Sequence, residues 1–364
     1  MRKYFVFLLV LAACIHADAS GRPGRTRDRK TGLKASAEVL YYFDNREFAY
    51  SGDYPLASMT THAVVLTPAL ELYMNTGKSS KHSLVLGCDL SHDMGSGTWK
   101  DFFREGLLYY HGQSGSARGR FDAYAGIFPK SAMHSEWSEA VFSDLNRFLD
   151  RNMEGLLLRW ESDRFMTEAA CDWMGLKGYD RKERFQILCA GEWTPLRYFS
   201  AGWNVSYYHY AGSELAPGVA DNGLGSVFVK LGGATGKKAL REIYLKASLM
   251  QGYHRDRTVS NSLTTPTGGE IETALKLYAV KLSQTVYFGG DQLPFYEGHD
   301  TAGNPYGSNL YFGQPLYRGF YDRVELAWEP KITKILRLKL SARAHFNSTG
   351  FLGWQQVVSL KVCF

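Results

Sequence analysis

The chain has 364 residues, of which 14% are aromatic and 21% are charged, and its formal net charge is +6. This length fits two ordinary soluble domains or one large β-barrel. The mean hydropathy of -0.27 does not separate these classes, because lipid-facing and lumen-facing residues average out in a barrel. Much of the positive charge lies in the short segment 22–30, so we expect no nucleic-acid partner.

The first nineteen residues have the features of a signal peptide. Arg2 and Lys3 precede an apolar run, residues 4–13, that is too short to span a bilayer as a helix. Two processing sites compete. Residues 17–19 (Ala-Asp-Ala) form a cleavage site that leaves Ser20 first, whereas Leu-Ala-Ala-Cys at 11–14 resembles a lipobox and would leave a lipidated Cys14. Either site predicts export.

Alternation of apolar and polar residues with a period of two recurs along the rest of the chain. In the first such segment Val39, Tyr41 and Phe43 share one face, while Glu38 and Asp44 lie on the other. Further segments lie at 64–74, 84–90, 102–114, 119–129, 153–162, 165–175, 184–194, 197–211, 224–234, 239–253, 268–280, 281–292, 317–330, 335–347 and 350–364. Helix-period stretches are nearly absent. The pattern predicts about sixteen strands, with fourteen as the alternative because the segments near 102 and 317 have uncertain ends.

The connections between these strands alternate in length. Long connections such as 130–152 and 293–316 follow odd-numbered strands, and tight ones such as 162–164 and 194–196 follow even-numbered strands. No fixed repeat length indicates a β-helix or a propeller, and no later segment reaches 18 uninterrupted apolar residues, which disfavours a helical membrane protein. We therefore expect an all-β, transmembrane, antiparallel up-and-down β-barrel with short periplasmic turns and long external loops; a secreted soluble β-rich protein is the alternative.

The sequence thus predicts three parts of the chain. Residues 1–19 form the signal peptide, residues 20–32 a basic periplasmic tail, and residues 33–364 the transmembrane barrel. The last segment, 351–364, ends on an aromatic carboxyl terminus and resembles the closing strand of bacterial outer-membrane barrels. In such proteins the assembly machinery recognises a terminal aromatic residue. We therefore predict Phe364 as an outer-membrane targeting residue, the barrel-assembly machinery and outer-membrane lipid as partners, and a location in the outer membrane of a Gram-negative bacterium.

Alternation also predicts which side chains face the lumen. On the penultimate strand Leu336, Leu338 and Leu340 point outward, so the basic residues between them point inward, because a basic residue facing the bilayer midplane costs about 2 to 4 kcal/mol. We call the resulting predicted pore-lining set the ladder residues: Arg323, Glu325, Arg337, Lys339, Arg343, His345 and Lys361. Their charges either form salt-bridge networks that stiffen the wall or create a transverse field that orients solutes in transit.

A sixteen-stranded barrel is wide enough to hold an aqueous channel, which only inward-folded loops could close. The best candidates for such a constriction are 130–152, which is predicted to be partly helical through 135–149, and 293–316. We therefore predict a porin-like channel for passive or substrate-biased passage of small hydrophilic solutes, monomeric or homo-oligomeric. A surface-exposed binding or assembly protein anchored by its barrel is the alternative, and a hydrolase with its site at the barrel rim comes third.

Catalytic and metal-binding motifs give little support to an enzyme. His92-Asp93, His134-Ser135 and His209 near Ser206 offer the ingredients of a hydrolase, but no motif such as G-x-S-x-G or H-E-x-x-H selects a nucleophile. Residues 300–304 are faintly like a calcium loop but lack its closing Glu. The cysteines have no metal-ligand spacing. The sequence thus predicts no catalysis, no cofactor and no metal.

Three short motifs carry a resemblance to a known group. Residues 41–48 (Tyr-Tyr-Phe-Asp-Asn-Arg-Glu-Phe), 310–313 (Leu-Tyr-Phe-Gly) and 353–356 (Gly-Trp-Gln-Gln) look like those of uncharacterised outer-membrane barrel proteins of Bacteroidota. The resemblance covers most of the mature chain and implies a barrel and its location rather than a substrate. Asp44, Asn45 and Arg46 lie where the first strand meets its external loop, as a binding site or, more simply, as a turn network.

Overall fold

The computed structural model describes residues 30–48, 58–77, 79–98, 101–258, 261–296, 298–304, 306 and 316–364. The predicted signal peptide, most of the predicted basic tail and the motif at 310–313 lie outside these residues.

The described residues form seventeen strands, one short α-helix and two single-turn 3-10 helices. The strands are β1 Thr31–Phe48, β2 Met59–Asn75, β3 Ser80–Asp93, β4 Phe103–Ser116, β5 Gly119–Pro129, β6 Asn152–Glu161, β7 Phe165–Gly175, β8 Glu183–Leu196, β9 Phe199–Ala211, β10 Val219–Ala234, β11 Leu240–Asp256, β12 Leu263–Thr264, β13 Thr267–Leu277, β14 Val280–Gly289, β15 Gly319–Trp328, β16 Leu336–Asn347 and β17 Gly350–Cys363. The helices are η1 Lys130–Ala132, α2 Asp144–Leu149 and η2 Pro294–Tyr296.

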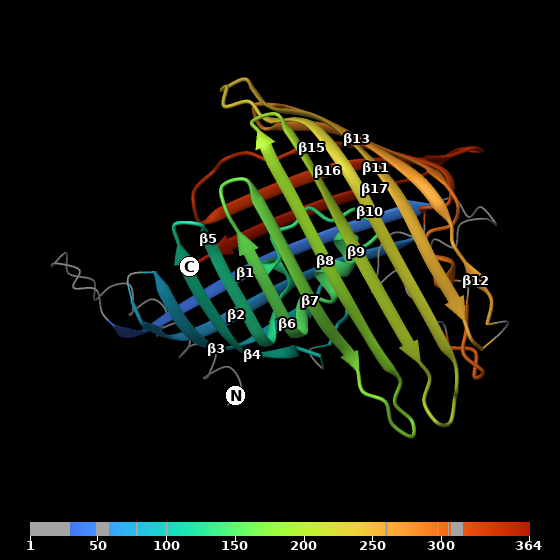
Figure 1. Cartoon of the computed structure of the whole chain (residues 1–364), viewed down its shortest axis with the longest axis horizontal. Coiled ribbons are helices and arrows are strands. Elements are labelled where there is room, and N and C mark those ends of the chain that lie inside the picture. The colour runs from blue at the N-terminus through green and yellow to red at the C-terminus, as the bar shows by residue number, and fades with distance from the viewer. Residues whose placement is uncertain are drawn as a thin grey trace.

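The strands close into one antiparallel barrel (Figure 1). Each long strand pairs with its neighbours in the chain, and β1 pairs with both β2 and β17. The two-residue β12 only extends the edge of β11, so sixteen strands make the wall. The predicted fold class and strand count are therefore confirmed, and closure leaves no sheet edge unpaired in the bilayer.

The two ends of the barrel differ in their connections. At one end the links are short, such as 117–118 and 162–164, and the chain enters the wall at Thr31 and leaves it after Cys363. The long links, including 130–151 and 290–318, lie at the opposite end. Short turns mark the periplasmic end of an outer-membrane barrel, so we call the end with the long links the external end.

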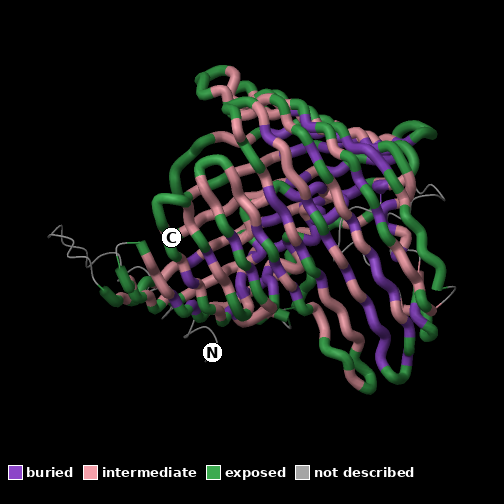
Figure 2. The backbone as a smooth tube through the Cα atoms, viewed as in Figure 1, coloured by how far each residue is buried: buried purple, intermediate pink, exposed green. Residues whose placement is uncertain are grey.

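The wall sorts its side chains as the period-two pattern predicts. On β10 and β11 the outward residues Val227 and Leu249 are 58% and 60% exposed, whereas the inward residues Phe228 and Met250 are buried. Buried and exposed positions accordingly alternate along single strands (Figure 2). Large exposed apolar side chains around the outer surface are expected where lipid replaces water. Among the described residues, the helices are all too short or too polar to cross a membrane.

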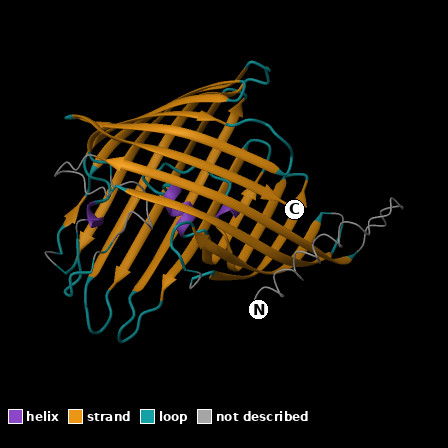
Figure 3. Ribbon diagram, turned by 180° about the vertical axis from the view of Figure 1, so that it is seen from behind, coloured by secondary structure: helices purple, strands orange, loops and turns teal. Residues whose placement is uncertain are grey.

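The lumen is crossed by the link between β5 and β6, residues 130–151, which we call the strap. Its helices lie inside the ring of strands (Figure 3). Trp137, Phe142 and Leu145 of the strap are buried, and Phe148 stacks on Tyr42 of β1 at 4.3 Å between ring centroids. These side chains occupy part of the lumen, which water fills in a porin that lacks such a segment. The strap therefore forms the constriction that the sequence predicts for this loop.

The helix in the strap occupies the last part of the segment 135–149, which the sequence predicts to be partly helical. It begins only after Ser143, whose hydroxyl accepts a hydrogen bond from the backbone N–H of Asn146, and it ends at Leu149. Upstream, the Ser138 hydroxyl accepts from the backbone N–H of Ala140. Serine side chains that bond nearby backbone groups favour turns and helix starts over helix interiors, which is why a single long helix does not form.

Candidate functional site

Four of the ladder residues, Arg323, Glu325, Arg343 and His345, lie beneath the strap. Arg323 forms an ion pair with Glu139 of the strap, and Arg343 forms one with Asp144. Arg343 also contacts Glu325 at 3.2 Å. His345 is fully buried, and its Nδ1 atom lies 2.9 Å from the Tyr321 hydroxyl. These side chains therefore face the lumen but meet protein partners there.

The remaining ladder residues lie nearer the periplasmic end. Lys339 pairs with Glu325 at 2.9 Å, and Lys361 pairs with Glu38. Arg337 is exposed at the start of β16. That the ladder residues line a path for solutes stays a prediction. The same holds for targeting by Phe364, whose exposed side chain lies at the seam, where its backbone N–H donates to Ala37 O at 2.8 Å.

Further ion pairs fasten the strap around the lumen. Lys130 contacts Asp150 at 2.6 Å and Asp172 of β7 at 3.0 Å, and Arg151 contacts Glu38 of β1 at 2.9 Å. Burial alone would lower the pKa of Lys130, but these two carboxylates raise it above its ordinary value. Ion pairs thus connect the strap to β1, β7, β15 and β16.

The Asp144–Arg343 latch is expected to persist over a wide pH range. Burial by itself raises the pKa of Asp144, but the charges of Arg343 and Lys339 outweigh it and hold that pKa well below its ordinary value. A carboxyl group whose pKa is depressed by folding stabilises the fold above its unfolded pKa of about 3.9, and that contribution is lost as the pH falls through the folded value. Only strong acid should release this latch.

Removing the Arg343 side chain should destabilise the barrel. Arg343→Ala removes the cation that Asp144 and Glu325 share. Breaking a fully buried pair costs about 3 to 5 kcal/mol, and the cost here should be smaller, because Lys339 still pairs with Glu325 and the Asp144 side chain is 33% exposed. Arg337→Ala is the matched control, because Arg337 lies on the same strand but is exposed. Urea unfolding of the refolded barrel followed by tryptophan fluorescence measures both. Equal midpoints for the two variants would show that the latch does not stabilise the fold.

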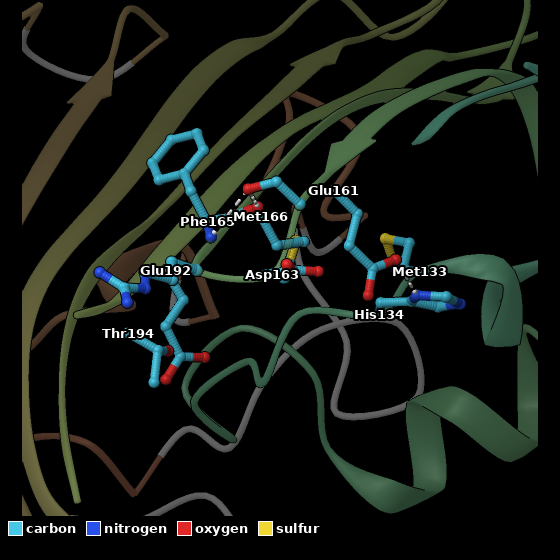
Figure 4. A pocket seen from close by; sticks show the side chains of 10 residues that line it. Met133, His134, Glu161, Asp163, Phe165, Met166, Glu192 and Thr194 are labelled. Carbon is cyan, nitrogen blue, oxygen red and sulfur yellow. Dashed lines mark hydrogen bonds and ion pairs between the residues drawn. The ribbon is translucent and has the colours of Figure 1, made fainter. Parts of the chain in front are cut away.

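A pocket of about 650 Å³ lies between the strap and the periplasmic turn that joins β6 to β7. Figure 4 shows His134 and Glu161 pointing toward each other across it, and His134 Nδ1 lies 3.6 Å from a Glu161 carboxylate oxygen. Ser135 turns away from His134, because its hydroxyl contacts the Met166 sulfur at 3.6 Å. The His134-Ser135 candidate is therefore not assembled as a nucleophile and base, and its pocket faces the end away from the external leaflet.

The other two histidine candidates are also separated from their sequence neighbours. His92 and Asp93 are adjacent in β3, so their side chains leave opposite faces of the wall. Ser206 lies in the lumen, where its hydroxyl accepts from Gln186 at 2.8 Å, whereas His209 is an odd number of residues away and faces outward. None of the predicted His–Ser or His–Asp combinations is brought together.

His209 instead meets a carboxylate that the sequence analysis missed. Its Nδ1 atom lies 2.6 Å from an oxygen of Asp221, which is directly opposite it on β10. Tyr207 donates to the same oxygen at 2.8 Å, and Arg257 donates to the other oxygen at 2.6 Å. The Asp221 side chain is 1% exposed, and that of His209 is 18% exposed. We call His209, Asp221, Tyr207 and Arg257 the rim cluster.

The rim cluster lies on the membrane face near the external end of the wall. His209 is the third residue from the end of β9, and Asp221 is the third residue of β10. Phe185 stacks on the His209 ring at 5.0 Å, and Trp173 stacks on Phe185 at 5.1 Å. Aromatic rings of this kind mark the interface between hydrocarbon and headgroups. The partly exposed His209 ring therefore lies at the height of the headgroup region of the outer leaflet.

The loop at Asp300 has no character of a cation site. One Asp300 oxygen accepts from the backbone N–H groups of Ala302 and Asn304, and the other accepts from the Tyr210 hydroxyl. Hydrogen-bond donors and the Lys182 ammonium group at 3.8 Å thus satisfy the carboxylate. In the part of the chain that the structure describes, no group of three or more His, Cys, Asp or Glu side chains has an arrangement that could hold a metal ion.

Comparison with known proteins identifies the family. The sequence model of the lipid A 3′-O-deacylase-type family matches residues 25–349. The chain belongs to this family. No protein of curated function matches it in sequence. The prediction that the chain is not an enzyme is wrong, because the lipid A 3′-O-deacylase-type family is named for an esterase activity. The prediction rested on the absence of a contiguous catalytic motif, which an esterase does not need.

Solved structures resemble this member of the deacylase-type family in fold alone. OmpT of Vibrio cholerae with loop L8 deleted superposes with a TM-score of 0.54 at 8% identity, covering 92% of this chain and 100% of that one. In-vitro folded OmpT of Vibrio cholerae gives 0.52 at 7% identity, covering 93% and 99%. Both are outer-membrane proteins, so fold and family together support an outer-membrane β-barrel in a Gram-negative bacterium. The resemblance to proteins of Bacteroidota and assembly into homo-oligomers stay predictions.

Proposed function

We propose that the protein hydrolyses an ester that links an acyl chain to lipid A in the external leaflet, with the rim cluster as its catalytic centre. The family name supports the reaction class. The observation that carries the location is the 2.6 Å contact between His209 and the buried Asp221 on the membrane face. A histidine oriented by a carboxylate is the recurring general base of ester hydrolysis.

The reaction needs one base, one water molecule and one oxyanion partner. His209 Nε2 takes a proton from water while the water oxygen attacks the ester carbonyl carbon. The tetrahedral intermediate then collapses, the C–O bond to the sugar oxygen breaks, and the His209 imidazolium returns the proton to that leaving oxygen. The products are a fatty acid and the alcohol form of the lipid, so the atoms balance with water as the co-reactant.

The other members of the rim cluster prepare His209 for this role. Asp221 accepts a hydrogen bond from the Nδ1–H group of His209, which favours the tautomer with an unprotonated Nε2 for the substrate. Tyr207 and Arg257 fix the carboxylate from two directions. The Arg257 side chain is 48% exposed, and its outer N–H groups supply donors for the developing oxyanion.

Replacing His209 tests the proposal directly. The purified, refolded protein in mixed micelles with lipid A should release a free fatty acid, measured by mass spectrometry of both products, and His209→Ala should lower the rate by about 10²- to 10⁴-fold. His62→Ala is the matched control, because His62 lies opposite Phe43 near the external end of another part of the wall and bonds only a tyrosine hydroxyl at 3.0 Å among the contacts described.

The outcomes separate the reaction from its site. No fatty acid released by the unmodified protein would disprove hydrolysis of lipid A. Release that survives His209→Ala would place the reaction elsewhere, and His134→Ala, in the pocket beneath the strap, then becomes the next variant to test.

We also propose a second function, restricted passage of small hydrophilic solutes through the lumen. The pocket of about 650 Å³ beneath the strap favours it, because this pocket extends the periplasmic mouth inward toward the constriction. The charged ladder residues would then bias which solutes pass whenever the strap is displaced. Conductance in planar bilayers tests this proposal.

A further inference from the structure

The external rim beside His209 carries more positive than negative charge. Arg255 of β11 is directly opposite Asp221 of β10, and Asp221 is directly opposite His209 of β9. Residues directly opposite each other in an antiparallel sheet share a face, so Arg255 faces outward beside the rim cluster. Arg257, two residues further along the chain, contacts Asp221 from the same side.

Three cationic or potentially cationic groups therefore lie around one carboxylate, that of Asp221. Asp221 pairs with Arg257 and His209. Arg255 donates only to the Asn261 carbonyl oxygen at 3.4 Å among the contacts described. The neighbouring Asp256 does not compensate it, because this carboxylate accepts from the Tyr306 hydroxyl and the Thr258 backbone N–H on the other side of the strand. The guanidinium of Arg255 thus lacks a carboxylate partner within this cluster.

The outer surface below these arginines is largely apolar, with Gln251 of β11 as an exposed polar residue between Tyr253 and Leu249. Tyr253 on β11 and Tyr207 on β9 lie one outward position deeper than Arg255 and His209 on their strands, and Leu249 and Val205 follow deeper still, with exposures of 60% and 43%. Two guanidinium groups therefore lie at headgroup height above a surface that faces acyl chains. Guanidinium forks match phosphate oxygens in geometry and charge.

We propose that Arg255 and Arg257 form a phosphate seat that binds the headgroup phosphate of an anionic lipid and holds its ester next to His209. The proposal rests on the proposed function for its catalytic consequence. The ligand chemistry is a phosphate monoester or diester on a membrane lipid, which either lipid A or a phospholipid such as phosphatidylglycerol could supply. Arg255 then acts as a positioning residue, since it contacts headgroup rather than reacting atoms.

The kinetic test compares substrates with and without phosphate. Arg255→Gln should raise KM for lipid A about 10- to 100-fold, the size expected for loss of one charge-assisted hydrogen bond, and should leave kcat nearly unchanged. Dephosphorylated lipid A should show no difference between the variant and the unmodified protein. Arg255→Lys should restore part of the effect. Arg241→Gln is the matched control, since Arg241 lies on β11 at the periplasmic end. Equal increases in KM for lipid A and for dephosphorylated lipid A would disprove the phosphate seat.

A binding measurement tests the seat without catalysis. In the His209→Ala background, native mass spectrometry should show lipid A retained by the barrel and lost on Arg255→Gln. Phosphatidylglycerol, with diacylglycerol as its phosphate-free counterpart, is measured in parallel to tell which lipid source the seat accepts. Retention without any hydrolysis by the unmodified protein would support the seat and disprove the proposed function. Retention that is indifferent to Arg255 would disprove the seat.

Discussion

Asp221→Asn should lower kcat for ester hydrolysis by about 10⁴-fold, as expected when the carboxylate that orients a catalytic histidine becomes an amide. The amide has nearly the same shape but can offer its NH₂ group to His209, which favours the wrong tautomer. It also removes the negative charge that stabilises the imidazolium during reaction. Arg257 loses its ion pair, but at 48% exposure it stays solvated, so the fold should survive. Steady-state kinetics on lipid A micelles measure the loss.

The matched control is Asp322→Asn. Asp322 also lies on the outer face of the wall, where it accepts from the Gln284 side-chain NH₂ group at 3.1 Å, but the contacts described give it no histidine partner. Its replacement should leave kcat unchanged. If Asp221→Asn and Asp322→Asn behave alike while heat-resistant migration shows both barrels folded, the His209–Asp221 pair is not the catalytic centre.

The wall could be predicted from sequence because its determinants are local. Each strand needs only to place lipid-facing side chains such as Leu338 and Leu340 on one side and charged ones such as Arg343 on the other. This period of two needs no knowledge of distant partners. The lengths of the connections then give the order and direction of the strands, because consecutive antiparallel strands pair with each other in an up-and-down barrel.

The rim cluster could not be predicted in the same way, because it depends on register. His209 and Asp221 come from two strands joined by a seven-residue link, 212–218, and a slip of one residue would place them on opposite faces. The nearness of Ser206 to His209 is visible in the sequence, but Ser206 faces the lumen and His209 faces outward. The available signal was the hairpin itself: counting outward positions on both strands would have paired an outward histidine with an outward carboxylate.

The path of the strap is the other feature that the period-two pattern does not predict. The sequence indicates that residues 130–152 are long enough to fold inward, but its partners lie on strands far away in the chain. Asp144 meets Arg343 across 199 positions, and Ser138 meets Glu270 across 132. Arg323 and Arg343 face the lumen, and the strap carboxylates that neutralise them lie in a segment whose path no repeat specifies.

Deleting the strap should convert a silent barrel into a conducting one. Residues 134–149 can be replaced by a short Gly-Ser linker without straining the wall, because the two ends of the strap are adjacent: Lys130 N donates to Arg151 O at 2.8 Å. The deletion removes Trp137, Phe142 and Phe148 from the lumen, and a sixteen-stranded barrel without its constriction has room for an aqueous path. Planar bilayer recordings should then show stepwise, salt-dependent openings that the intact protein lacks.

Two further variants show whether the ladder residues control that path. Glu139→Gln with Asp144→Asn keeps the strap but removes two of its ion pairs, and should give brief rather than sustained openings. In the strap deletion, Arg323 and Arg343 lose these carboxylates, so the path should favour anions. Changing Arg337, Lys339 and Arg343 to Glu in that background should reverse the preference toward cations. A folded deletion variant that stays silent would refute passage through the lumen, and unchanged selectivity would show that the ladder residues do not line the conducting path.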